Sequence, residues 1–248
     1  MPSEHPDSAR KFDVSRAGEY AEQSRIALAG YDACHELVAC MLAASLGSGR
    51  EARILVVGAG GTAQEILTAA ALEPLWRFTA VDPSAPMLEL AQASLQAHGL
   101  LSRTRVFLGT LEELTDEPPY DAATLVGVLH HLPGDQVKHD ILRAIAARLK
   151  PGAPLIVAGN HQAYASQPLL LAAWGERWRQ QGASADAVRA KLGKILQGAD
   201  PPHSEAAVQR LLEEAGFGTA TRFFSSLFWG PGWHRRASPR APERAQLP

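Results

Sequence analysis

The feature that most constrains the fold is the stretch from Arg53 to Glu65, which reads R-I-L-V-V-G-A-G-G-T-A-Q-E. Residues 54–57 form an unbroken apolar run, typical of a strand that is buried on both faces of a sheet. Three glycines follow this run directly: Gly58, Gly60 and Gly61. Glycine lets the backbone turn tightly and brings N–H groups close to a ligand at a helix N-terminus. The pattern therefore predicts a site for a nucleotide-type cofactor.

An acidic residue, Asp82, ends the next strand-like run, residues 77–81. Nucleotide-binding α/β folds place an acid at this point against ribose hydroxyls. A helix cap at the strand end is the simpler alternative. Because Pro83 and Ser84 follow, we favour the ribose contact and expect Ser84 to cap the helix that continues to Ala97.

Strands and helices alternate along most of the chain with short connections, which indicates an α/β fold with a parallel sheet covered on both faces. The predicted strands are residues 54–57, 77–82, 103–108, 121–126 and 155–158, and two final strands form a hairpin within 219–229. The predicted helices are residues 16–30, 32–46, one that begins near 62, 84–97, 135–149 and 204–215. Thr62 and Glu65 have the spacing of a capping box for the third of these helices.

Residues 167–197 interrupt the alternation with two helices that separate near Gly182 and carry Trp174 and Trp178 one turn apart. We expect these helices to form a cap over the cofactor. The domain hypothesis is a disordered N-terminus (1–11), one domain (12–233) and a disordered tail (234–248). Within the domain, residues 12–48 are N-terminal helices and residues 163–200 are the helical insertion.

Composition narrows the class of protein. Apolar residues make up 46% of the 248 residues, which is enough to form a large hydrophobic core. The net charge is only −2, so a nucleic-acid partner is not expected. Cys34 and Cys40 are too few for a disulfide framework. No signal-peptide core or apolar run of roughly 18 residues is present, so we expect a cytoplasmic protein with no membrane partner. A homodimer is compatible with the sequence.

Over roughly residues 50–230 the chain resembles the class I S-adenosylmethionine-dependent methyltransferases. Motifs in that family's order carry the resemblance: G-A-G-G-T (58–62), V-D-P-S-A-P-M-L-E-L-A (81–91), G-T-L-E-E-L (109–114), L-H-H-L-P (129–133), L-K-P-G-A-P-L (149–155) and E-E-A-G-F (213–217). The resemblance implies a Rossmann-like, seven-stranded methyltransferase fold, mostly parallel with a C-terminal antiparallel hairpin.

It also implies S-adenosyl-L-methionine as the cofactor and a small-molecule acceptor of the methyl group, with no metal site. The residues expected at the cofactor are Gly58, Ala59, Gly60, Gly61, Asp82, Pro83, Met87, Thr110, Leu111, Val126, Gly127, Tyr20 and Tyr31. Met87 is equally consistent with core packing. Tyr20 and Tyr31 could reach over the cofactor from the N-terminal helices or only seal the edge of the core.

The sequence departs from the family pattern at several positions. Val56 stands where an acid is common, Thr62 replaces the last glycine of the turn, and Val126-Gly127 occupies the place of an Asn/Asp-Pro-Pro motif. The last departure argues against methylation of adenine or glutamine amides.

The N-terminal segments F-D-V-S-R-A-G-E-Y (12–20) and A-G-Y-D-A-C-H-E-L (29–37) look more narrowly like the enzymes that modify the wobble uridine of tRNA with a carboxylated form of the cofactor. As that resemblance implies, those enzymes hold the extra carboxylate with an arginine. The matching position here is Leu211, with Arg210 one residue away. We therefore expect the ordinary cofactor.

His131 and His130 are the titratable pair expected near the point of methyl transfer. A histidine accepts a proton near neutral pH, which suits an O–H or N–H acceptor. Structural packing is the alternative for at least one of them. Trp174 and Trp178 are the candidate substrate walls, with a core role as the alternative.

Four functions remain after this reading: a small-molecule methyltransferase, a tRNA-modifying enzyme of related architecture, a non-catalytic cofactor-binding protein and a nicotinamide dehydrogenase. We favour transfer of a methyl group to an O or N atom of a small molecule.

Overall fold

The structure is a computed structural model that describes residues 19–115, 118–230 and 232–237. Seven strands form one sheet in the order β3-β2-β1-β4-β5-β7-β6. Their bounds are β1 Arg53–Val57, β2 Arg77–Asp82, β3 Thr104–Leu108, β4 Ala122–Val126, β5 Pro154–Ala158, β6 Thr221–Arg222 and β7 Gly232–Arg235. The first five strands are parallel, and β7 pairs antiparallel with both β5 and β6. The predicted fold class is confirmed.

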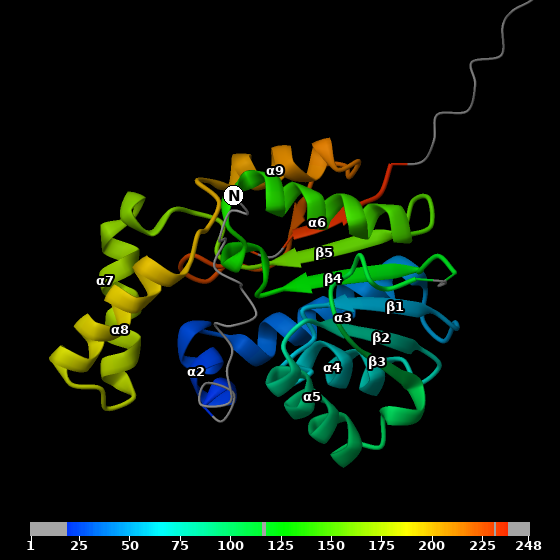
Figure 1. Cartoon of the computed structure of the whole chain (residues 1–248), viewed down its shortest axis with the longest axis horizontal. Helices are drawn as coiled ribbons and strands as arrows, with labels where there is room; N and C mark the ends of the chain where they lie inside the picture. Colours follow the sequence, from blue (N-terminus) through cyan, green and yellow to red (C-terminus); the bar gives the residue numbers. More distant parts are fainter. Residues whose placement is uncertain (1–18, 116–117, 231, 238–248) are drawn as a thin grey trace, which may run out of the picture.

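Helices cover both faces of the sheet (Figure 1). Those of the α/β core are α3 Tyr31–Leu46, α4 Gln64–Leu72, α5 Ala85–Ala97, α6 Gly134–Arg148 and α9 Glu205–Glu214. Alternate residues of β1 point to opposite faces, as the period of a strand requires. Ile54 and Val56 pack in the core with α3, α4 and α5, and Leu55 and Val57 pack in the core with α6 and α9.

Three further helices lie beyond the carboxyl ends of β4 and β5: α2 Tyr20–Ala27, α7 Pro168–Gln180 and α8 Ala185–Gly198 (Figure 1). The two helices of the insertion are as predicted, with Gly182 between them at φ +87°. They do not stand free, because α7 packs against α2. The insertion therefore packs against α2 through α7.

The start of α4 differs from the prediction. Ala63, in the left-handed conformation at φ 52°, occupies the N-cap position, and no side chain caps the helix. Thr62 Oγ1 instead shares a 2.7 Å hydrogen bond with the Tyr31 hydroxyl. The capping-box interpretation of Thr62 and Glu65 is wrong, because the helix begins one residue later than that spacing requires. Ser84 is the N-cap residue of α5, but its side chain makes no cap hydrogen bond either.

The end of the sheet also differs. The predicted hairpin within 219–229 contains only the short β6, because Ser226 and Trp229 close a turn around Leu227, whose φ is +51°. The last strand is β7, which extends to Arg235, so the prediction of a disordered tail from residue 234 is wrong at its start. β7 is held by β5, with His234 opposite Leu155. The expected disorder of 1–11 and of the tail after Ala237 lies outside the described residues.

Among the described residues, no single helix is long and apolar enough to cross a membrane. Only the pair α2 and α3, bent by 84°, meets that criterion together.

Candidate cofactor and catalytic site

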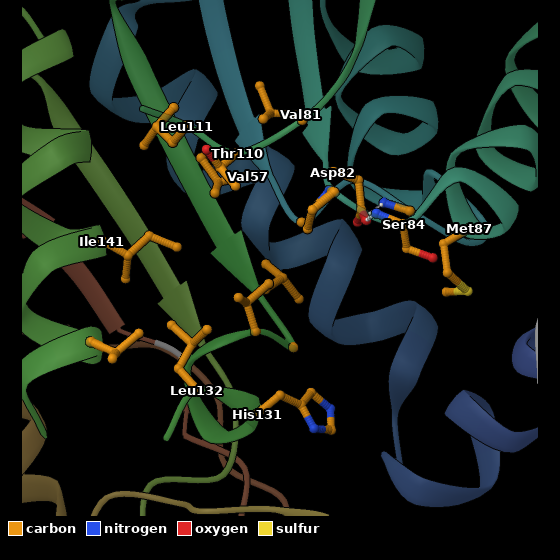
Figure 2. A pocket seen from close by; sticks show the side chains of 18 of the residues that line it. Val57, Val81, Asp82, Ser84, Met87, Thr110, Leu111, His131, Leu132 and Ile141 are labelled. Atoms are coloured by element: carbon orange, nitrogen blue, oxygen red, sulfur yellow. Dashed lines mark hydrogen bonds between the residues drawn. The ribbon is translucent and has the colours of Figure 1, made fainter. Parts of the chain in front are cut away.

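A cavity of about 400 Å³ opens at the carboxyl ends of the parallel strands (Figure 2). Cavities of this size accept ligands of cofactor or drug dimensions. Two kinds of surface face each other across it. Asp82, Ser84 and Met87 lie on one side, whereas Leu111, Leu132 and Ile141 lie on the other. The cavity therefore combines a polar end with an apolar recess.

The glycine turn after β1 forms the floor of the polar end. A Cβ atom on Gly60 would lie 2.6 Å from both Oδ2 of Asp82 and Cβ of Met87, so only glycine fits there. A Cβ on Gly58, whose φ is +74°, would lie 2.1 Å from Val128 Cγ2. The turn is thus pressed against β2 and against the loop after β4, and this close approach brings three walls of the cavity together.

Asp82 is a fixed, buried carboxylate. Its Oδ2 accepts a 2.9 Å hydrogen bond from the Gly60 N–H, and its Oδ1 accepts a 2.8 Å bond from the Ser84 N–H. Burial raises the pKa of Asp82, and the two N–H groups act in the opposite direction. Each carboxylate oxygen has more than one lone pair, so both can still accept a ligand hydroxyl. Asp82 is not the helix cap, because the N-cap residue of α5 is Ser84 and the Asp82–Ser84 bond closes the turn before that helix.

The apolar recess is built by the segment after β3 and by α6. Thr110 and Leu111 line it as predicted. The Thr110 N–H donates to Glu113 Oε2 at 2.7 Å, so this amide already has a partner within the chain. The sequence did not point to Val137, Asp140 and Ile141, since one turn of an ordinary amphipathic helix carries them. Their place beside the cavity depends on how α6 packs over β4.

The two adjacent histidines have different surroundings. His131, at the end of the 3₁₀ turn Leu129–His131, lines the cavity. His130 is 5% exposed, and its Nδ1 lies 3.4 Å from the Asn160 N–H, so this nitrogen is the acceptor. The Trp229 ring meets His130 edge-on at 5.6 Å between centroids. The packing role thus falls to His130, and His131 is the histidine within reach of a ligand.

The two tyrosines predicted at the cofactor site also differ in their positions: Tyr20 lines the cavity and Tyr31 does not. Tyr20 lines the cavity, with its ring against Gly61, where an added Cβ would lie 2.3 Å from Cε1. Tyr31 is not a lining residue, because its hydroxyl bonds Thr62 Oγ1. Burial raises the pKa of Tyr31 to about 12 and also raises the pKa of Tyr20. Both hydroxyls therefore stay protonated near neutral pH.

Trp174 and Trp178 lie outside the cavity lining. They are 4% and 5% exposed and pack with Tyr164, Phe228 and Ile26. Trp174 Nε1 donates to the Ala27 carbonyl at 2.8 Å, which ties α7 to the end of α2. The structure thus does not bring these rings to the place expected for substrate walls; they are core residues between α2 and the insertion.

Most of the predicted cofactor residues do meet at the cavity. These are Gly58, Gly60, Asp82, Pro83, Met87, Thr110, Leu111, Val126, Gly127 and Tyr20. Ala59 and Gly61 belong to the glycine turn but are not lining residues, and Ala59 is 1% exposed. The cavity lining also includes residues without a predicted role: Glu112, Val57, Val81, Ser84, Gly109, Val128 and Leu132.

Comparison with known proteins agrees with this geometry. Residues 55–155, from β1 to the start of β5, match a family model described as a methyltransferase domain. Among curated proteins, no sequence matches the chain. The matched segment contains the glycine turn, Asp82 and His131. This segment is therefore similar to a methyltransferase domain, and the chain has a Rossmann-like fold.

Solved structures with this fold include several methyltransferases. Human N-acetylserotonin methyltransferase, solved with S-adenosylmethionine, is similar with a TM-score of 0.66 and 16% identity over 96% of this chain and 61% of that chain. For an O-methyltransferase family 2 protein from Planctomyces limnophilus DSM 3776, in complex with apigenin, the TM-score is 0.64 and the identity is 17% over 95% of this chain and 63% of that chain. For the mitomycin 7-O-methyltransferase MmcR, the TM-score is 0.58 and the identity is 20% over 94% of this chain and 74% of that chain. This chain spans about three fifths of the length of the first two proteins.

Proposed function

We propose that the protein is an S-adenosylmethionine-dependent methyltransferase that transfers the methyl group to an oxygen or nitrogen atom of a small-molecule acceptor. The observation that carries this proposal is the fixed Asp82 carboxylate. It is held by Gly60 and Ser84 at the rim of a cavity whose far side is apolar. The methyltransferase domain matched by residues 55–155 supports the same conclusion.

The residues present suit this cofactor. Asp82 offers acceptor oxygens for ribose hydroxyls, and the recess that contains Leu111, Leu132 and Ile141 offers apolar walls for a flat base. In this proposal the amino-acid end lies along the glycine turn, which a side chain at position 60 would force away from Asp82 and Met87. When bound, the cofactor supplies a methyl group on a positively charged sulfur, which is already electrophilic.

The chain's own part in the reaction is then to align the groups, to exclude water and to take a proton. Alignment alone lowers the barrier substantially when the reacting atoms are held in the attack geometry. His131 lies where a proton of an O–H or N–H acceptor can be taken. Val128 and Gly127, from the same loop after β4, close the floor beside it.

The acceptor in this proposal is a small, partly planar molecule. Two methyltransferases with this fold support it: one was solved with apigenin, and the other acts on mitomycin. Since Trp174 and Trp178 are core residues, the acceptor would meet the cavity from the side of the loop after β4. Trp229 lies against that loop, with its Cη2 atom 3.6 Å from a Cβ built on Gly127.

The ordinary form of the cofactor is preferred over the carboxylated form in this proposal. Among the described residues that line the cavity there is no lysine or arginine. Leu211, the position that matches the arginine of the tRNA-modifying enzymes, is 6% exposed in the core between α9 and the sheet. An extra carboxylate would therefore find no cation supplied by these residues.

Calorimetry and a product assay test the proposal together. We expect S-adenosylmethionine and S-adenosylhomocysteine to bind and NAD to bind more weakly or not at all. Formation of S-adenosylhomocysteine should then increase with one of a panel of phenols, hydroxylated heterocycles and amines, and not with tRNA. Binding of NAD without S-adenosylmethionine would overturn the assignment, and methylation of tRNA but of no metabolite would move the protein to the tRNA-modifying class.

A further inference from the structure

Glu65 is a buried carboxylate that has no cation beside it among the described residues. Its residue is 9% exposed, and its Oε1 has no hydrogen-bond partner. Its Oε2 lies 4.0 Å from Nε2 of His35. Glu65 lies in the first turn of α4 but is not its N-cap residue, and the hydrogen bond that lowers its pKa comes from its own backbone N–H. A buried carboxylate with an oxygen that has no hydrogen-bond partner destabilises the fold, which indicates a role other than stabilising the protein.

His35 does not neutralise Glu65. Nδ1 of His35 lies 2.8 Å from the Tyr31 carbonyl oxygen, which only accepts, so Nδ1 carries the hydrogen. In the neutral ring Nε2 then has no hydrogen to donate. Burial also lowers the pKa of His35, which keeps the ring neutral near pH 7. The contact between His35 and Glu65 is therefore not an ion pair under ordinary conditions.

In the described part of the chain, the other titratable groups around Glu65 are neutral or acidic. They are Tyr20 from α2, Tyr31 and Cys34 from α3, and Asp82 from β2. Arg25 stacks over the Tyr31 ring at 4.8 Å, but its guanidinium bonds Asp32 at 2.9 Å. Burial raises the pKa of Glu65 to about 7, and the charge of Asp82 adds to the shift. A positive charge is what this group of side chains lacks.

The place for such a charge is the end of the cavity at Tyr20. Tyr20 and Asp82 both line the cavity, and Glu65, which acts electrostatically on Tyr20, lies behind that lining. The Tyr20 ring covers Gly61, four residues before Glu65. A ligand bound along the glycine turn would bring its amino-acid end to this point, and that end carries an ammonium group in the proposed cofactor.

We infer that Glu65 is a specificity-determining residue, whose carboxylate selects ligands that carry an ammonium group at the Tyr20 end of the cavity. The inference rests on the proposed function, since it assigns one end of the same cofactor. Glu65 acts here through charge from behind the cavity lining. The ammonium group would stabilise the ionised carboxylate, and the carboxylate would in turn strengthen binding of the ammonium group.

Two ligands isolate this effect. S-adenosylhomocysteine has the amino-acid end, whereas 5′-methylthioadenosine shares its adenine, ribose and sulfur but has no ammonium group. Calorimetry at pH 8 on the full chain should show that Glu65→Gln weakens binding of S-adenosylhomocysteine roughly tenfold, the effect of an ionic interaction equivalent to about one pKa unit. Binding of 5′-methylthioadenosine should change less than about twofold. Glu65→Asp should restore part of the loss, and the exposed Glu89→Gln is the matched control.

A pH series supplies a second measurement. Between pH 8 and 6 the preference of the wild-type protein for S-adenosylhomocysteine over 5′-methylthioadenosine should fall, because Glu65 becomes protonated. The preference of Glu65→Gln should stay flat. Asp82 contributes to both ligands through their shared ribose, so its titration cancels in this ratio.

The outcomes separate the inference from the function on which it rests. Equal losses for both ligands in Glu65→Gln would show a merely structural residue, and an unchanged preference would remove Glu65 from recognition altogether. Either result overturns the inference while both ligands still bind the wild-type protein. If the wild-type protein binds neither ligand, the proposed function itself fails. Thermal unfolding of each variant verifies that it is folded, and Gln, which has the size of Glu without its charge, should fold at least as well.

Discussion

The backbone N–H of Gly60 donates a hydrogen bond to Oδ2 of Asp82 across 2.9 Å. This bond links the turn after β1 to the end of β2, and these two strands are neighbours in the sheet. A second bond from the Ser84 N–H holds the other oxygen of the same carboxylate. One side chain therefore fixes the glycine turn, the start of α5 and the acceptor atoms offered to a ligand.

Asp82→Asn should weaken cofactor binding by about 1.5–3 kcal/mol, because the charged acceptor is lost. The variant should also unfold more easily, by about 1–3 kcal/mol, since the amide NH₂ cannot accept from one of the two N–H groups. Calorimetry with S-adenosylhomocysteine and denaturant unfolding measure the two effects. The exposed Glu51→Gln is the control, and full affinity in a folded Asp82→Asn would reduce Asp82 to a structural residue.

Gly60→Ala should abolish measurable cofactor binding, because its Cβ would lie 2.6 Å from Asp82 Oδ2 and Met87 Cβ. The cause is steric, since the φ of Gly60 is not positive. Gly193→Ala, within α8 and with no atom within 4 Å of an added Cβ, should instead stabilise the protein by about 0.5–1 kcal/mol. Thermal shift with and without cofactor compares the two, and normal binding by Gly60→Ala would contradict the described packing.

His131→Ala should lower turnover by roughly 10²-fold or more while cofactor affinity stays nearly unchanged. The reason is its position at the cavity, where it can take the proton of an O–H or N–H acceptor. Steady-state kinetics with the acceptor found in the screen, together with calorimetry, make the measurement. The exposed His203→Ala should behave like the wild type. Full turnover of His131→Ala would mean that the acceptor loses its proton without this residue.

Trp174→Ala should destabilise the protein by about 3–5 kcal/mol, because it removes a buried ring and leaves the Ala27 carbonyl without its donor. Trp174→Phe should lose less stability, and its KM for the acceptor should equal that of the wild type, since the ring lies outside the cavity lining. Denaturant unfolding and kinetics separate the two properties. A raised KM in a fully stable Trp174→Phe would restore the substrate-wall hypothesis.

Acid should destabilise the fold through His161. Burial, with smaller effects of His234 and Arg222, lowers the pKa of His161 to about 3 from 6.5. Below pH 6.5, His161 therefore binds a proton in the unfolded chain but not in the folded chain. The free energy of unfolding should fall as the pH drops from 6.5 toward 3. His161→Gln should flatten this dependence. His35 and His234 act in the same direction, so a smaller slope should remain. An unchanged slope would show that His161 titrates normally.

The sequence by itself determined the five parallel strands of the sheet and most of the cofactor cavity. Buried strands appear as short apolar runs, and the glycines after β1 and the acid after β2 are local signals that each follow directly on a strand. Because parallel strands end at one edge of a sheet, these signals also imply one common site. Gly58, Gly60, Asp82 and Thr110 could therefore be assigned to the cavity before their distances were known.

Only the tertiary structure decided which of the remaining residues reach that site. Trp174 and His130 lie in the packed core because of how α7 meets α2 and how the loop after β4 meets β5, which no local pattern records. Glu65 is a second residue whose place the sequence could not predict. Its spacing from Thr62 predicted a helix cap, but Ala63 is the N-cap residue of α4, and the Glu65 carboxylate is buried beside His35. Periodicity fixes the face of an element on which a side chain lies, but its partners depend on contacts between elements far apart in the chain.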